Sequence, residues 1–156
     1  MDPIPCITTG LVTLSILEEE YAALEEAEER SDACKEILQG TQATIAECME
    51  VQEDDAAFDR LQRARFLEEG LLANERTNQE RVKRLRVRVS KHVEGLLSTI
   101  AALLQSEDAQ KADPTGEGLR SSVLLLTTLY ERPIRETVDF IRTQLHTYRL
   151  SLSVDG

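Results

Sequence analysis

The sequence is poor in the residues that interrupt regular secondary structure. It contains no Trp, four Pro and seven Gly in 156 residues, and aromatic residues make up only 4% of the chain. So few turn-forming residues favour a small number of long elements. Apolar residues recur at three- and four-residue steps through most of the chain and nowhere alternate as in a strand, so we predict an all-α protein.

Motifs that carry common enzyme chemistry are missing as well. The sequence contains no phosphate-binding loop, no dinucleotide-binding glycine pattern and no nucleophile elbow. Its two histidines, His92 and His146, lie far apart in the sequence, and no Glu-x-x-His pair completes a di-iron arrangement. We therefore predict a protein that is not an enzyme, with no catalytic residue, no metal and no cofactor.

The cysteines and the N-terminus indicate an intracellular protein. Cys6, Cys34 and Cys48 are an odd number without metal-ligand spacing, and each falls among apolar residues of a predicted helix, which is typical of buried thiols. Asp2 stands where a secretory signal would carry basic residues. We expect a cytoplasmic location, because thiols stay reduced there.

Negative charge is concentrated in the first third of the chain. The net charge is −11, yet Met1 to Asp55 holds 15 acidic residues against only two basic ones, a balance of −13. The glutamate-rich stretch from Glu18 to Glu29 is most simply a solvated helix face. An acidic chain repels nucleic acid and anionic lipid overall, so only a local basic patch could bind a polyanion.

The most regular apolar stripe lies between Arg81 and Leu104, and we expect this helix to be central to the fold. Its members keep helical spacing for about six turns: Val82, Leu85, Val89, Val93, Leu96, Ile100 and Leu103. The helix also opens with six of the 18 basic residues, four of which fall together away from the stripe: Arg81, Arg84, Arg88 and Lys91.

These four basic residues are a candidate interaction surface. The simplest interpretation is a solvated face, and the next is pairing with the acidic first third, within or between molecules. Lipid or nucleic acid is the least favoured partner, because no aromatic residue that could stack on bases lies among them. We therefore predict a protein partner, which is either a second copy of the chain or another protein, and no nucleic acid.

The N-terminal segment is a second candidate surface. Ile4 to Leu17 is uncharged and is followed by three glutamates, and it is shorter than the ~20 residues that span a bilayer. Its apolar spacing continues through the glutamates, which predicts one amphipathic helix from about Pro5 to Arg30. The residues that could meet a membrane or a partner helix are Ile4, Ile7, Leu11, Leu14 and Leu17.

Two helices are predicted between the first helix and the central one. The second begins at Ser31 or Asp32, unless the first helix continues through Ser31. The third follows Asp55 and ends near Asn74, unless it continues into the central helix. Their predicted apolar sides hold Cys34, Ile37, Leu38, Thr41, Ile45, Cys48, Met49 and Val51 in the second, and Phe58, Leu61, Ala64, Phe66, Leu67, Leu71 and Leu72 in the third.

The last part of the chain is predicted to contain a loop and an interrupted helix. Residues 106–118 are expected to form the loop, because they are rich in Pro and Gly and contain no apolar side chain larger than Ala. Helical spacing then runs from Leu119 to Leu152, with a kink or short break at Arg132 because Pro133 cannot donate to the preceding turn.

The predicted fold is a single domain, residues 1–156, formed by an all-α bundle of five or six helices with long antiparallel members. The first and last helices are expected to pack near the central helix. A homo-oligomer is one of the assemblies that such apolar faces allow.

Three stretches resemble a known family. They are Met1 to Leu14 (MDPIPCITTGLVTL), Ser31 to Leu38 (SDACKEIL) and Arg142 to Ser153 (RTQLHTYRLSLS). They resemble the N-terminal helical domains of fungal STAND (NLR-like) proteins of the HeLo-like group. The resemblance implies an all-helical signalling domain that acts through protein interactions, in some cases at membranes through its first helix.

Two alternatives to this function remain open. The long apolar seams equally predict a structural coiled-coil subunit of a larger assembly. A membrane-active helical domain would use Ile4 to Leu17, although the glutamates from Glu18 to Glu20 cut that apolar run short and argue against insertion.

Overall fold

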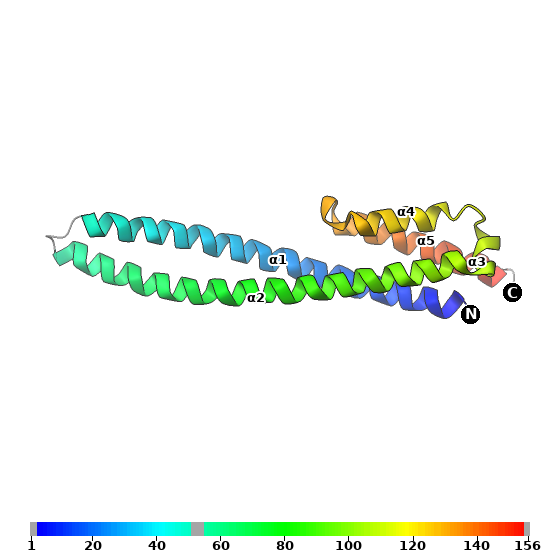
Figure 1. The fold of residues 1–156 in the computed structure, drawn as a ribbon, viewed down its shortest axis with the longest axis horizontal. Coiled ribbons are helices and arrows are strands. Elements are labelled where there is room, and N and C mark those ends of the chain that lie inside the picture. The colour runs from blue at the N-terminus through cyan, green and yellow to red at the C-terminus, as the bar shows by residue number, and fades with distance from the viewer. Residues whose placement is uncertain (1–2, 51–54, 155–156) are drawn as a thin grey trace. The chain divides into compact units, whose positions relative to one another are not determined.

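The computed structural model of the protein describes residues 3–50 and 55–154. Its elements are α1 (Pro3–Glu50), α2 (Asp55–Gln105), α3 (Glu107–Ala112), α4 (Glu117–Thr127), the 3-10 helix η1 (Leu129–Glu131) and α5 (Ile134–Val154) (Figure 1). No strand occurs among these residues, so the prediction of an all-α protein is confirmed.

The predicted number of helices, five or six, is too high. Within the described residues, four helices are longer than ten residues, because α1 continues through Ser31 and α2 continues through Asn74. Ser31 does not cap a helix; its hydroxyl donates to the carboxylate of Glu75, 3.3 Å away. The polar run after Asn74 stays helical, and Gln79 donates across one turn to Glu75 at 2.9 Å.

The predicted loop, residues 106–118, contains one short helix, and its last two residues already belong to α4. Residues 107–112 form α3, and the chain then turns at Asp113, whose Oδ1 accepts hydrogen bonds from the Thr115 hydroxyl and from the backbone N–H of Gly116. Gly116 has φ of 63°, which an L residue adopts only with strain. The turn is therefore fixed by an Asp side chain and by a glycine.

The break before Pro133 lies where the sequence predicts it. Helix α4 ends at Thr127, η1 follows, and Arg132 is extended with φ of −138° and ψ of 158°. Helix α5 begins directly after the proline. Because the residue before a proline is driven away from the helical region, the chain is redirected at this point.

Contacts divide the chain into two compact units. The first, here called the bundle unit, comprises Met1–Ala22 and Arg86–Gly156, and the second, the hairpin unit, comprises Ala23–Leu85. Helices α1 and α2 each contribute to both units. The expectation of a single domain stays a prediction.

The bundle unit has a fully buried apolar core, with contributions from α1, α2, α4 and α5. Its residues with exposed fractions of 0 or 1% are Ile7, Leu14, Leu17, Val89, Leu96, Ile100, Leu103, Leu119, Val138, Ile141 and Leu145. Helix α4 lies along α5 (Figure 1). A Cβ built at Gly10 of α1 would lie 3.2 Å from Leu145 of α5 and 3.3 Å from Thr99 of α2. The first and last helices thus pack beside the predicted central helix.

The hairpin unit is an antiparallel pair of helical segments with one seam. The buried or half-buried seam residues are Leu24, Ala27, Ser31, Cys34, Leu38, Thr41, Ile45 and Cys48 on α1, and Ala57, Leu61, Ala64, Glu68, Leu71, Glu75, Asn78, Val82 and Leu85 on α2. On both helices they alternate three- and four-residue steps, the heptad pattern of a coiled coil. Val51, which the sequence placed on this apolar side, lies outside the described residues.

The close packing at Gly10 can be tested with two glycine substitutions. Gly10→Leu should lower the free energy of unfolding by about 1–3 kcal/mol, because the added side chain would overlap Leu145 and Thr99. Gly95→Ala on α2 is the control, since nothing lies within 4 Å of an added Cβ there. The control should gain up to ~1 kcal/mol through helix propensity. Urea unfolding followed by circular dichroism measures both, and a Gly10→Leu variant as stable as the wild type would contradict the packing.

Candidate interaction surfaces

The four predicted basic residues all lie on α2 with exposed side chains. Arg81 and Arg84 belong to the hairpin unit, and Arg88 and Lys91 belong to the bundle unit. None of the four side chains forms an ion pair or hydrogen bond with the part of the chain that the structure describes. Their role in binding a partner stays a prediction, and their charges are available for one.

The side chains of the predicted N-terminal surface are largely buried within the bundle unit. Ile7, Leu14 and Leu17 are 0% exposed in the core of the bundle unit, and Ile4 and Leu11 are half-buried. These side chains would have to leave that core to meet a membrane or another helix. In residues 3–50 and 55–154, no helix is long and apolar enough to cross a membrane.

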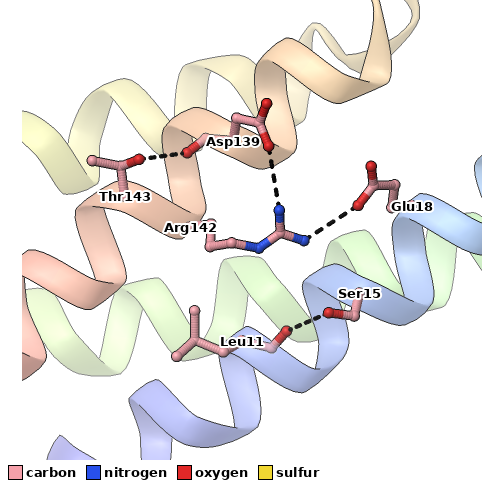
Figure 2. A network of polar contacts seen from close by, with 6 residues as sticks. All are labelled: Leu11, Ser15, Glu18, Asp139, Arg142 and Thr143. Carbon is pink, nitrogen blue, oxygen red and sulfur yellow. Dashed lines mark hydrogen bonds and ion pairs between the residues drawn. The ribbon is translucent and has the colours of Figure 1, made fainter.

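One arginine connects α1 with α5 in the bundle unit (Figure 2). Arg142 of α5 donates through Nη2 to Glu18 of α1 and through Nη1 to Asp139 of its own helix, both at 3.2 Å. The Arg142 and Glu18 side chains are about one third exposed, 33% and 34%. Pairs this accessible contribute roughly 0–1 kcal/mol each, so this contact orients α5 more than it stabilises the fold.

A second polar contact joins α1 to α2. Nε2 of His92 lies 3.0 Å from Oε2 of Glu20, within ion-pair distance but outside hydrogen-bond geometry. Next to it on α1, the ring of Tyr21 packs against Tyr130 with centroids 5.7 Å apart. Part of the glutamate-rich stretch is therefore paired within the bundle unit rather than simply solvated.

A cleft of about 470 Å³ lies beside the turn that follows α3, and the Tyr148 side chain reaches into its lining. The Tyr148 hydroxyl donates to Oδ2 of Asp113 at 2.8 Å. That hydrogen bond, with a second from Thr115, lowers the pKa of Asp113, while burial and then the Asp113 carboxylate raise the pKa of Tyr148 well above its usual value. The phenol stays protonated and the carboxylate ionised, so the pair anchors the turn to α5.

The hairpin unit contains a buried polar cluster around Glu75, which is 7% exposed. Its Oε1 accepts hydrogen bonds from Ser31 and Gln79 and lies 3.7 Å from Nζ of Lys35. Its Oε2 has no hydrogen-bond partner among the described residues. A polar group in a coiled-coil seam costs stability but favours the one register in which it is satisfied.

Cys34 belongs to the same cluster. Its Sγ donates to the backbone carbonyl of Leu71 at 3.5 Å. Burial, followed by the negative charge of Glu75, raises the pKa of the Cys34 thiol. A thiol whose pKa is raised is a poor nucleophile at neutral pH. The described residues hold no group of three His, Cys, Asp or Glu side chains that could bind a metal ion.

Six large apolar side chains are exposed on the bundle unit, and six more are exposed on the smaller hairpin unit. Those of the hairpin unit are Phe66 (80% exposed), Phe58 (60%), Ile37 (54%), Leu67 (50%), Met49 (48%) and Leu72 (38%). Apolar side chains that gather on an exposed helix mark interaction surfaces when they lie close together. The sequence placed all six hairpin residues on the apolar sides of its predicted helices, and the structure leaves all six exposed. The apolar sides predicted for these helices are wider than a two-helix seam can cover. This width was the feature of the sequence that could have indicated their exposure.

Comparison of the chain with protein-family models, with curated proteins and with solved structures finds no match in any of the three.

The raised pKa of Cys34 leads to a test of the polar cluster. At pH 8 the thiolate fraction of Cys34 should be lower than that of an ordinary cysteine, because its pKa is higher. Glu75→Gln removes the negative charge and keeps the side chain's size, so the pKa should fall and Cys34 should react severalfold faster with iodoacetamide. Peptide mass spectrometry measures the rate.

The control is Cys48, a second buried thiol of the hairpin unit in the same sample. A faster reaction of both cysteines would indicate that the substitution opens the hairpin. An unchanged ratio of the Cys34 rate to the Cys48 rate would contradict electrostatic coupling between Cys34 and Glu75.

Proposed function

We propose that this protein is a non-enzymatic protein-interaction and signalling domain whose hairpin unit carries the binding surface. The observation that carries the proposal is the set of six exposed apolar side chains on the hairpin unit. Two helical segments bury only the one seam between them, so side chains beside the seam stay in water unless another helix covers them. A helical partner that lies along the hairpin would bury them.

The signalling part of the proposal rests on the resemblance to the N-terminal domains of fungal NLR-like receptors. Two of the resembling stretches, Met1 to Leu14 and Arg142 to Ser153, fall in the bundle unit, and the third, Ser31 to Leu38, falls in the hairpin unit. In this proposal the bundle unit is the stable part of a cytoplasmic domain. Partner binding is assigned to the hairpin unit.

A structural coiled-coil subunit is the second candidate function. It is favoured by the uninterrupted heptad spacing of the hairpin seam on both α1 and α2. Such a subunit would be an obligate oligomer, whereas a signalling domain would exchange between free and bound states. The concentration at which the chain dissociates distinguishes the two candidates.

Light scattering of the full chain over a range of concentrations tests the proposal. The wild type should show a mass that rises with concentration. Replacement of Ile37, Met49, Phe58, Phe66, Leu67 and Leu72 by Ser should leave a folded monomer, because the apolar area that drives association is gone. A wild type that dissociates only when it unfolds would favour the coiled-coil subunit.

The matched control replaces three apolar residues exposed on the bundle unit, Val12, Leu124 and Leu150, which are 56, 61 and 68% exposed. This variant should associate like the wild type. If only the control variant lost association, the binding surface would lie on the bundle unit and not on the hairpin unit. A wild-type chain still monomeric at about 1 mM would mean an association weaker than ~4 kcal/mol and would contradict self-association.

A further inference from the structure

The hairpin unit has two flanks that the seam defines. On each helix, the residues directly before the seam residues lie on one side of the seam, and those directly after lie on the other. Because the two segments are antiparallel, the preceding residues of both helices share one flank. Ile37 and Leu67 directly precede seam residues, so both lie on this flank, which is called the Ile37–Leu67 face.

The centre of the Ile37–Leu67 face is apolar and contains two glycines. Ile37 and Leu67 are 54% and 50% exposed, and Gly40 and Gly70 also precede seam residues. A Cβ added at either glycine would have nothing within 4 Å. Each glycine costs its helix up to ~1 kcal/mol relative to Ala, and no contact within the described chain accounts for that cost. A second helix could approach the backbone closely there.

The charged residues towards the ends of this face differ between the two helices. Glu26 and Glu47 precede seam residues on α1, while four arginines do so on α2: Arg60, Arg63, Arg81 and Arg84. Glu26 is paired at 2.6 Å with Arg30, the one basic residue on the α1 side of the face. Glu47 and the four arginines are exposed, and their side chains make no ion pair or hydrogen bond within residues 3–50 and 55–154. The unpaired charges of this face are therefore one carboxylate on α1, that of Glu47, and four arginines on α2.

The contacts of the seam fix which residues lie level across the hairpin. Ser31 contacts Glu75, and Cys34 contacts Leu71. In that register Ile37 lies level with Leu67 to within about two residues, or ~3 Å along the helix axis. By the same rise per residue, Glu47 lies level with Arg60.

This arrangement is self-complementary about a two-fold axis parallel to the helices. Such an axis places α1 of each copy against α2 of the other at the same level. Ile37 then meets Leu67 of the second copy, and Glu47 meets its Arg60. A two-fold axis perpendicular to the helices would place α1 against α1 and α2 against α2 instead, so that Glu47 would not meet Arg60 of the second copy.

We propose that the Ile37–Leu67 face binds a second copy of this chain, with the two hairpin units side by side and parallel, α1 of each against α2 of the other. The pair is a four-helix arrangement in which two new seams repeat the α1–α2 pairing of the hairpin itself. This inference rests on the proposed function, because it names the partner of the same hairpin surface.

Charge reversal tests the parallel pairing in the full chain. Glu47→Arg and Arg60→Glu should each weaken self-association roughly tenfold, because every pair contains the Glu47–Arg60 contact twice. An equimolar mixture of the two variants should restore wild-type affinity to within about twofold, because both contacts in the mixed pair again join opposite charges. Sedimentation velocity measures all three samples. Association unaffected by either substitution, or a mixture no stronger than the single variants, would overturn the proposal.

A matched pair of apolar substitutions identifies the flank. Leu67→Glu on the Ile37–Leu67 face should give a monomer, and Leu72→Glu on the opposite flank, beside the seam residue Leu71, should associate like the wild type. Thermal unfolding followed by circular dichroism shows that both variants stay folded. If Leu72→Glu abolishes association and Leu67→Glu does not, this inference fails while the proposed function stands. A wild type that binds a different protein but not itself would likewise contradict this inference and leave the proposed function standing. A chain that binds no protein would contradict both the inference and the proposed function.

Discussion

The number of neighbouring helices determines how much of each long helix can be buried. In the bundle unit, α1 and α2 are packed with α4 and α5, and eleven apolar side chains there are exposed by no more than 1%. Within the hairpin unit each segment can pack only against the other, and several seam residues are half-buried. The same two helices thus form a well-packed core in one unit and a narrow seam in the other.

The composition of the two cores follows this difference. Both units bury small polar side chains, Ser122 and Thr137 in the bundle unit and Ser31 and Thr41 in the hairpin unit, but Glu75, the only charged residue buried in the described part of the chain, lies in the hairpin seam. A narrow seam excludes water less completely, so its polar groups cost less to bury. Once buried, the Glu75 cluster favours the register in which Ser31 and Gln79 can donate to it. The hairpin unit gains a defined register at some cost in stability.

The sequence was sufficient for features that depend on local periodicity. Of the seven residues in the predicted central stripe, six are buried and Val93 is half-buried. The break before Pro133 was equally predictable, because a proline restricts both itself and the residue before it. Whether the helices end at Ser31 and Asn74 was not predictable in the same way, because the packing of a continuous seam outweighs a weak capping preference.

Contacts between distant parts of the chain left no local signal. Glu18 pairs with Arg142, and Glu20 approaches His92, so the acidic run could be assigned partners only when the fold was known. The exposed apolar residues of the hairpin unit escaped prediction for a related reason. Periodicity identifies which residues share a helix face, but it does not indicate how many neighbouring helices are present to cover that face.

In the proposed pair, charge determines which helix of a second copy can cover the exposed sides of the hairpin helices. In residues 23–50 of α1 the side facing away from the seam carries only acidic charges: Glu25, Glu29, Asp32, Glu36 and Glu50. Two such surfaces repel each other at any register, so association through α1 alone is disfavoured. The corresponding part of α2 carries four arginines on one flank of its seam, and in the proposed pair this flank meets α1 of the second copy. The acidic outer side of α1 and the arginines beside the α2 seam therefore favour the proposed arrangement, in which unlike helices meet. The seam inside each hairpin already has that pairing.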